Sequence, residues 1–288
     1  MTTPYPTTPG DTRNLALFCD FENVALGVSE SKDAKFEIGL VLERLLLKGS
    51  IVVKKAYCDW DRYKGFKAGM HEASFELIEI PHVRQSGKNS ADIRMVVDAL
   101  DLCYTKAHVD TFVIISGDSD FSPLVSKLRE NNKTVIAVGV KNSTSNLLIA
   151  NCDEFIFYDD LVREQRGKTK RAAPEKKPAR KTTASPAATA NATAAAPAVT
   201  SEEKDRKQEA FELVLATTEA LAAERGEEDK IWGSMIGQAL KRRNPGFAAS
   251  YYGFKSFNQL LEEAAVRGLL TIERDGKSGA YLVKSAPH

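Results

Sequence analysis

The 288-residue chain lacks the cysteine patterns of a zinc site or of a disulfide-rich secreted protein. It has four cysteines, none of which forms a CxxC pair: Cys19, Cys58, Cys103 and Cys152. We expect them to be buried free thiols in a reducing cytoplasm. His71-Glu72 lacks the second histidine of an HExxH motif, which argues against a zinc protease.

The sequence also shows no targeting or membrane-spanning segment. Its start, MTTPYPTTPGDTRN, has no basic region followed by an apolar core, so no signal peptide is expected. No apolar run approaches the roughly 20 residues of a membrane span. We therefore expect a cytoplasmic protein without a membrane partner. The net charge of +1 names no partner, so any nucleic-acid signal must come from local patches.

The phosphate-binding loops of common nucleotide enzymes are missing. CDFENVALG stands after the first apolar run, where a dinucleotide-binding protein would carry GxGxxG, and GxxxxGK[ST] does not occur. No Ser/His/Asp set can be assembled. Asp20 and Glu22 have the spacing of the DxD pair of phospho-aspartyl hydrolases, so that class stays open.

Short apolar runs alternate with amphipathic ones from residue 14 to 162. The spacing predicts strands at 15–20, 51–58, 75–80, 111–116, 134–140 and 154–158, and helices at 36–49, 61–75, 90–106, 121–132 and 143–151. In helix 90–106 the residues Ile93, Val96, Val97 and Leu100 share one face. Alternating elements with fully apolar strands predict an α/β fold, with a Rossmann-like, mostly parallel sheet flanked by helices.

The rest of the chain divides into a linker and a second globular region. We expect residues 1–13 to be disordered, and 163–201, which is basic and then rich in alanine and proline, to form a disordered linker. Its basic half is either a solvated charge run or an arm that attracts phosphates. Residues 202–285 regain globular patterning, with three helices and then two strands around a Gly-rich turn. This order predicts a small α+β winged-helix domain.

Acidic side chains follow two of the expected strands. Asp20 ends the first strand, Asp118 and Asp120 follow the fourth, and Asp92 opens the middle helix. If the first and fourth strands are neighbours, all four carboxylates meet at one edge of the sheet. Clustered carboxylates repel one another and resist burial, so we expect a cation between them. Oxygen ligands suit Mg²⁺ or Mn²⁺, which activate water for attack on a phosphodiester.

Each of these residues also has a simpler structural explanation. Asp20 and Asp120 are candidate caps, and Asp92 is a first-turn carboxylate favoured by the helix dipole. Capping does not explain why all the acids gather at one edge. Asn23 either orients a ligand or hydrogen-bonds within its loop. Ser116 either supports a neighbouring aspartate or is an ordinary turn serine.

Two cations flank Asp92 in the sequence. Lys88 and Arg94 are close enough along the chain to reach phosphates of a substrate bound at this edge. A solvated surface position is the alternative for each of them.

Three segments resemble the motifs of NYN domains, a branch of the PIN-like nuclease fold. They are CDFENV with Asn23, SADIRMVVDAL, and VIISGDSDFSPLV, within about residues 14–160. The resemblance implies metal-dependent ribonuclease activity. It places Asp20, Asp92, Asp118 and Asp120 at the four acidic positions of the family, and all four are aspartate here. The basic-Gly-small pattern common before the middle aspartate is kept only loosely, which leaves the role of Lys88 open.

The C-terminal region resembles the LOTUS, or OST-HTH, winged-helix domain. The resemblance rests on IWGSMIGQALKRRNPGF, YYGFKSFNQLLEEA and LLTIERDGKSGAYLV, and it implies RNA binding or protein docking. The cations that would contact RNA are Lys241, Arg242, Arg243 and Lys255. Tyr251, Tyr252 and Phe254 lie among them, either as stacking platforms for bases or as core residues.

These observations predict a ribonuclease that cleaves RNA at a four-aspartate site with Mg²⁺ or Mn²⁺ and captures single-stranded RNA through a tethered winged helix. A non-catalytic RNA-binding or adaptor protein is one alternative. A DNA-binding regulator that acts through the winged helix is another. Protein partners of the winged helix and homo-oligomerisation stay open.

Overall fold

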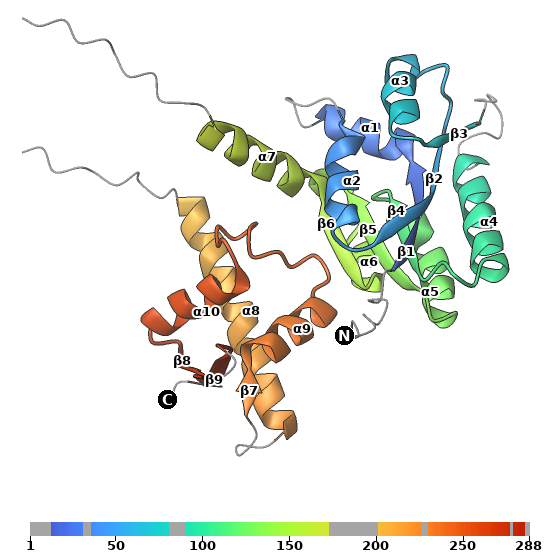
Figure 1. The fold of residues 1–288 in the computed structure, drawn as a ribbon. Coiled ribbons are helices and arrows are strands. Elements are labelled where there is room, and N and C mark those ends of the chain that lie inside the picture. Colours follow the sequence, from blue (N-terminus) through green and yellow to red (C-terminus); the bar gives the residue numbers. More distant parts are fainter. Residues whose placement is uncertain are drawn as a thin grey trace, which may run out of the picture. The chain divides into compact units, whose positions relative to one another are not determined.

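The structure is a computed structural model that describes most of the chain. The described residues are 13–30, 36–80, 90–172, 201–225, 230–276 and 279–285, with side chains left out at 167–172, 201–204, 225 and 285. The chain divides into two compact units, one built mainly on a larger sheet and the other mainly on a smaller one (Figure 1).

The larger unit is built on a six-stranded sheet in the order β3-β2-β1-β4-β5-β6, and every adjacent pair of strands is parallel. The strands are β1 (Asn14–Asp20), β2 (Ser50–Cys58), β3 (Glu76–Glu79), β4 (Thr111–Ile115), β5 (Thr134–Gly139) and β6 (Glu154–Phe157). The central strands are almost wholly buried, as fully apolar runs predict. The expected α/β fold with a flanked parallel sheet is therefore confirmed, including the pairing of β1 with β4.

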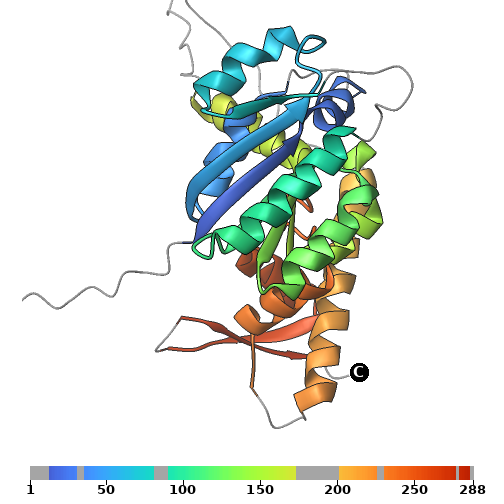
Figure 2. The same cartoon turned by 90° about the vertical axis from the view of Figure 1, so that its right-hand side faces the viewer.

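Helices cover both faces of this sheet. One face carries α1 (Phe21–Glu30), α2 (Ile38–Leu46), α3 (Lys64–Glu72) and the start of α7 (Tyr158–Ala172). The other carries α4 (Ser90–Thr105), α5 (Ser122–Glu130) and α6 (Asn146–Asn151). Figure 2 shows α4 and α5 side by side over the sheet. Two short 3₁₀ turns, η2 (Ser119–Phe121) and η3 (Lys141–Ser143), follow the ends of β4 and β5.

The core splits between the two faces because side chains alternate along a strand. Leu15 and Leu17 of β1 pack toward the α1–α3 face, whereas Ala16 and Phe18 pack toward α4 and α5. Asp20 lies two residues after Phe18 and so shares the face of Ala16 and Phe18. Its carboxylate is therefore on the α4 side of the sheet edge.

The buried face of α4 agrees only in part with the stripe predicted from the sequence. Val96 and Leu100 pack against the core beside the buried Met95, Ala99 and Cys103. The other two residues of the stripe are largely exposed, Ile93 at 63% and Val97 at 54%. The helix carries apolar residues on more than one face. Periodicity therefore shows that a helix forms here, but not which stripe packs.

Three elements were not expected from the sequence. Helix α1 begins directly after β1, and strand β7 (Ile231–Trp232) occupies the start of the segment IWGSMIGQALKRRNP, which was expected to be all helix. Helix α7 is the third, and it runs to Ala172, past residue 163, at which the linker was expected to begin. Residues 173–200 and 1–12 lie outside the described residues.

The smaller unit has a three-stranded antiparallel sheet in the order β7-β9-β8. The further elements of the C-terminal region are α8 (Ser201–Arg225), α9 (Gly233–Arg243), α10 (Phe257–Val266), β8 (Leu270–Arg274) and β9 (Tyr281–Ser285). Residues 238–247, which include the second half of α9, are grouped with the larger unit. The expected terminal hairpin is present as β8 and β9. Phe254 is buried and packs edge-on against Phe211 of α8, with ring centroids 5.6 Å apart. Among the described helices, none has both the length and the apolar character needed to cross a membrane.

Truncation tests whether the larger unit folds by itself. A protein that ends after Ala172 is expected to melt in one cooperative transition, because the six strands and their covering helices precede that residue. Ending it after Phe157 removes the buried Tyr158 and Leu161, and should lower the melting temperature by at least about 5 °C. Thermal melts followed by circular dichroism compare the two. Equal melting temperatures would show that the start of α7 contributes nothing to the core.

Candidate functional site

The ends of β1 and β4 lie together at the carboxyl edge of the larger sheet. The two strands are parallel, and Cys19 pairs with Ile115 at the end of their shared register. Asp20 and Ser116 are the next residues on each strand. Parallel pairing therefore places the end of CDFENV beside the start of SGDSD, as the sequence predicted.

Asp20 is the most buried carboxylate at this edge, with 7% of its surface exposed. The Ser116 hydroxyl donates to its Oδ2 at 2.9 Å, and the Asn23 backbone N–H donates to Oδ1 at 3.4 Å. Ser116 Oγ in turn accepts the Asp118 N–H at 3.2 Å. Ser116 therefore joins the carboxylate of one strand end to the backbone of the next, which is the supporting role considered for it.

The Asn23 side chain hydrogen-bonds to the loop after β4. Its Oδ1 accepts the Gly117 N–H at 2.9 Å, so the loop hydrogen bond is the role seen for this side chain. Gly117 is required here for space, because a Cβ at this position would lie 2.4 Å from the backbone oxygen of Ser143. Together these contacts hold the first turn of α1 against the turn that carries Asp118 and Asp120.

Asp118 caps the short 3₁₀ turn, whereas Asp120 does not act as a cap. The Asp118 Oδ1 accepts the Asp120 N–H at 2.9 Å. The capping role suggested for Asp120 thus belongs to Asp118. Asp120 is exposed, and no described residue donates a hydrogen bond to its carboxylate. Its side chain is free to meet a ligand from solvent.

Asp92 lies half-buried in the first turn of α4, where its carboxylate has no hydrogen-bond donor among the described residues. Burial, and then the charges of Asp118, Asp120 and Glu22, raise its pKa to about 6. All of these acids are thus near enough to oppose the ionisation of Asp92.

The pKa of Asp20 is raised to about 7, chiefly by burial and then by the charge of Asp92. The hydrogen bonds from Ser116 and Asn23 lower this pKa, and the charge of Asp118 raises it further. Asp92 therefore links the group electrostatically: its charge acts on Asp20, and the charges of Asp118 and Asp120 act on Asp92. No lysine or arginine among the described residues forms an ion pair with any of the four.

The donor set suits a hard divalent cation, although it is not arranged as a finished coordination shell. In the described part of the chain, no three His, Cys, Asp or Glu side chains are grouped closely enough to hold a metal ion. Carboxylates that repel one another stay apart unless a cation lies between them. The four carboxylates have no cationic partner among the described residues, and burial and mutual charge raise the pKa values of Asp20 and Asp92. Mg²⁺ and Mn²⁺ prefer oxygen ligands of this kind.

An ion pair beside the acids was not found from the sequence. Arg62, in the loop after β2, donates from Nη1 to Glu22 Oε1 at 3.2 Å. Glu22 lies in the first turn of α1, next to Phe21 and close enough for its charge to raise the pKa of Asp92. The partners are 40 residues apart, so no local pattern could indicate the pair.

The structure describes only one of the two basic residues that were predicted to contact phosphates beside Asp92. Arg94 pairs with Asp98 at 3.0 Å, and Asp98 also accepts the Tyr57 hydroxyl at 2.9 Å. Arg94 is therefore engaged on α4, and Asp98 belongs to a half-buried network rather than to an ordinary surface position. Lys88 lies outside the described residues.

The basic residues predicted to bind RNA in the C-terminal region are exposed, whereas two of the aromatic residues near them are buried in the core. Lys241, Arg242 and Arg243 form the last turn of α9, and their side chains and that of Lys255 are exposed. Tyr252 and Phe254 are buried, which leaves them unavailable for base stacking. Tyr251 is half-buried, with the Arg206 guanidinium 5.6 Å from its ring centroid.

The model of the NYN domain matches residues 14–159, a little over half of the sequence. The chain belongs to the NYN domain family. NYN domains are PIN-like and are generally nucleases, and the matched residues coincide with the larger sheet and its acidic edge. The coarse fold and family expected from CDFENV and SGDSDFSPLV are therefore confirmed.

No curated protein matches the chain. Among solved structures, a protein of unknown function from Vibrio parahaemolyticus is similar, with 26% sequence identity and a TM-score of 0.48. The match covers 54% of this chain and 98% of that one.

The raised pKa of Asp20 predicts how stability depends on pH in metal-free protein. An ordinary aspartate has a pKa of 3.8, so between about pH 4 and 7 folded Asp20 keeps a proton that the unfolded chain has lost. The unfolding free energy should therefore fall as pH rises through this range. Asp20→Asn carries no charge at either pH and should be free of this loss. The melting temperature of the variant relative to the wild type should therefore be higher at pH 8 than at pH 5 by at least about 4 °C. Calorimetry in EDTA at both pH values checks this, and an equal pH dependence in both proteins would contradict it.

Proposed function

We propose that this NYN-domain protein is a metal-dependent ribonuclease whose Asp20, Asp92, Asp118 and Asp120 bind Mg²⁺ or Mn²⁺. The observation that supports the proposal is the shared electrostatic field of these carboxylates, in which the pKa values of Asp20 and Asp92 rise to about 7 and 6. Perturbed pKa values of this kind are typical of functional sites. Four acids at one sheet edge, with no lysine or arginine paired to them among the described residues, are costly to keep together unless a cation binds between them.

The chain's own residues would divide the work. Asp20 is held in place by Ser116 and Asn23, which makes it the fixed ligand of the site. Asp92 and Asp120 have no hydrogen-bond donor among the described residues, so their oxygens are available to a cation. When bound there, Mg²⁺ or Mn²⁺ would neutralise developing charge and activate water. Arg62 pairs with Glu22, which lies beside the acids. Its guanidinium would therefore place a positive charge near a substrate phosphate at the same edge.

The C-terminal region, residues 202–285, would capture the RNA. Its helices with the sheet β7-β9-β8 support the winged-helix interpretation, and the exposed Lys241, Arg242 and Arg243 support contact with phosphates. The buried Tyr252 and Phe254 argue against extensive base stacking there. Capture through phosphates would be independent of sequence and would leave selectivity to the nuclease unit.

Asp120→Asn tests the catalytic site directly. The substitution removes a charge but keeps the shape of the side chain. Metal-dependent cleavage of a mixed RNA pool is expected to fall by orders of magnitude, while the melting temperature stays near that of the wild type because Asp120 is exposed. Asp101→Asn, an exposed aspartate in the middle of α4, is the matched control and should cleave normally.

The assay is run with Mg²⁺, with Mn²⁺ and with EDTA. Undiminished cleavage by Asp120→Asn would remove Asp120 from the site. Tight RNA binding by the wild-type protein, with no cleavage in any arm, would favour the non-catalytic adaptor instead.

Replacing Lys241, Arg242 and Arg243 together by Ala tests RNA capture. Each lost phosphate contact should lower the log–log salt slope of binding to single-stranded RNA by roughly 0.7, because fewer counterions are released. Affinity should fall similarly for unrelated sequences. Fluorescence anisotropy at several salt concentrations measures the slope, and a melt of the variant serves as control. If the melting temperature falls and the slope does not change, these residues only complement the dipole of α9.

A further inference from the structure

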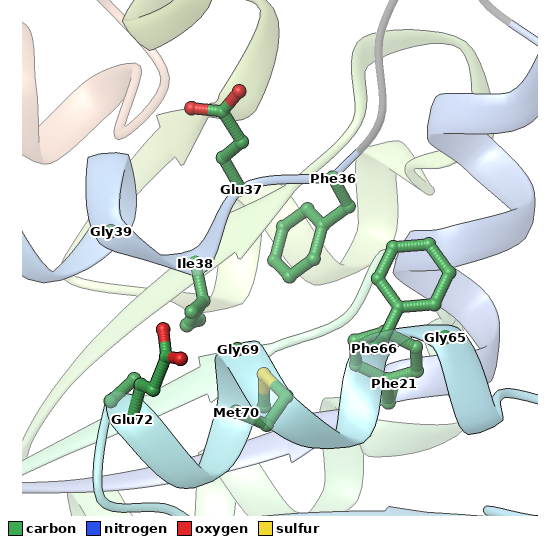
Figure 3. A pocket seen from close by; sticks show the side chains of 11 residues that line it. Phe21, Phe36, Glu37, Ile38, Gly39, Gly65, Phe66, Gly69, Met70 and Glu72 are labelled. Atoms are coloured by element: carbon green, nitrogen blue, oxygen red, sulfur yellow. The ribbon is translucent and has the colours of Figure 1, made fainter.

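A hollow on the outer face of α4 differs from the cavity beside α3. The cavity, of about 380 Å³, is a gap in the core, where the rings of Phe36 and Phe66 pack edge-on against the buried Phe21 (Figure 3). The hollow on α4 lies on the surface of the larger unit. The described residues that line it all belong to that helix: Ser90, Ile93, Arg94, Val97, Asp98 and Asp101.

The exposed face of α4 carries the spacing of a coiled-coil seam. Ile93, Val97 and Tyr104 are all exposed there, Tyr104 at 65%. With the half-buried Leu100 between them, these residues follow one another at intervals of four, three and four residues. Such alternation keeps an apolar stripe facing a second helix along its whole length. The opposite side of α4 packs on the sheet, so the helix that covers this stripe must come from outside the described part of the larger unit.

The hollow has the form of the holes into which the side chains of a facing helix insert. Each inserted side chain of a coiled coil is surrounded by four residues of the other helix, at spacings of three, one and three residues. The residues that line one end of the hollow have these spacings: Ser90, Ile93, Arg94 and Val97. Tyr104 projects from the other end of the same stripe. Helix α4 therefore carries both the hole and a side chain that could fill the hole of a second α4 in the antiparallel direction.

Charges beside the stripe favour this antiparallel pairing of two copies. Arg94 and Asp101 lie on the same flank of the stripe, seven residues apart. Arg94 is exposed and donates from Nε to Asp98, whereas no described residue pairs with the Asp101 carboxylate. In an antiparallel pair this flank lies against the same flank of the other helix, so Arg94 of each copy faces Asp101 of the other. In a parallel pair it would lie against the opposite flank, which carries the uncharged Val96 and Cys103.

We propose that the protein forms a two-fold dimer in which α4 packs antiparallel against α4 of a second copy. The axis passes between Val97 and Leu100, each Tyr104 enters the hollow of the other copy, and two pairs of Arg94 with Asp101 flank the seam. One helix of 16 residues is about 24 Å long, which makes a small interface, so the dissociation constant should be micromolar or weaker. Asp92 is not part of the stripe, and the dimer does not rest on the proposed ribonuclease function.

Sedimentation equilibrium of the full chain, from micromolar to millimolar concentration, tests this dimer. The wild type should rise with concentration from the mass of one chain toward that of two and no further, because a two-fold contact closes on itself. Val97→Glu places two like charges beside the axis and should weaken association at least tenfold. Val266→Glu, at an exposed position of α10, is the matched control and should associate like the wild type. Thermal melts should show that both variants are folded, because both positions are exposed.

Charge reversal at low ionic strength tests the direction of the pairing. Asp101→Arg sets an arginine against Arg94 on each side of the axis and should weaken association severalfold. Adding Arg94→Glu should restore association, because the pair re-forms with its charges exchanged. A wild type that stays monomeric at every concentration refutes the dimer and leaves the stripe to another part of the chain or to another protein. Association that Val97→Glu does not weaken refutes the contact through α4, and a double variant no better than Asp101→Arg overturns the antiparallel arrangement.

Discussion

The mutual repulsion of carboxylates at the carboxyl edge of the larger sheet is the constraint on which the rest of this site depends. Asp20 is almost fully buried, and no described cation pairs with it or with Asp92, Asp118 or Asp120. Burying a charge without a partner is expensive, and the usual response is a raised pKa. The raised pKa values of Asp20 and Asp92 show this response in the metal-free chain.

Neighbouring elements are arranged to hold these acids in spite of the repulsion. Ser116 and Asn23 fasten Asp20 to the turn after β4, and Gly117 lets that turn approach Ser143 closely. The apolar layers on both faces of the sheet supply the stability that such a site consumes.

Much of the larger unit could be predicted because its information is local. Fully apolar strands that alternate with amphipathic helices are typical of a parallel sheet, and acids at strand ends then share an edge. Helix α1 escaped prediction because it follows β1 without a loop, although the capping role suggested for Asp20 was a signal of its start. Strand β7 is two residues long and merges into α9.

Contacts between distant residues could not be predicted. The pairing of Arg62 with Glu22, and the network of Arg94, Asp98 and Tyr57, join segments about 40 residues apart. The exposed Ile93 on α4 shows a further limit, because apolar spacing does not tell which of two stripes packs.

Calorimetric titration of Mn²⁺ into metal-free protein at pH 6, in two buffers of different ionisation enthalpy, tests the central claim most directly. If the aspartates are the ligands, protons held by Asp20 and Asp92 must leave when the cation binds. The account predicts saturable binding with net proton release in the wild type, and loss of both in Asp20→Asn. Binding without proton release, or binding unchanged in Asp20→Asn, would contradict it.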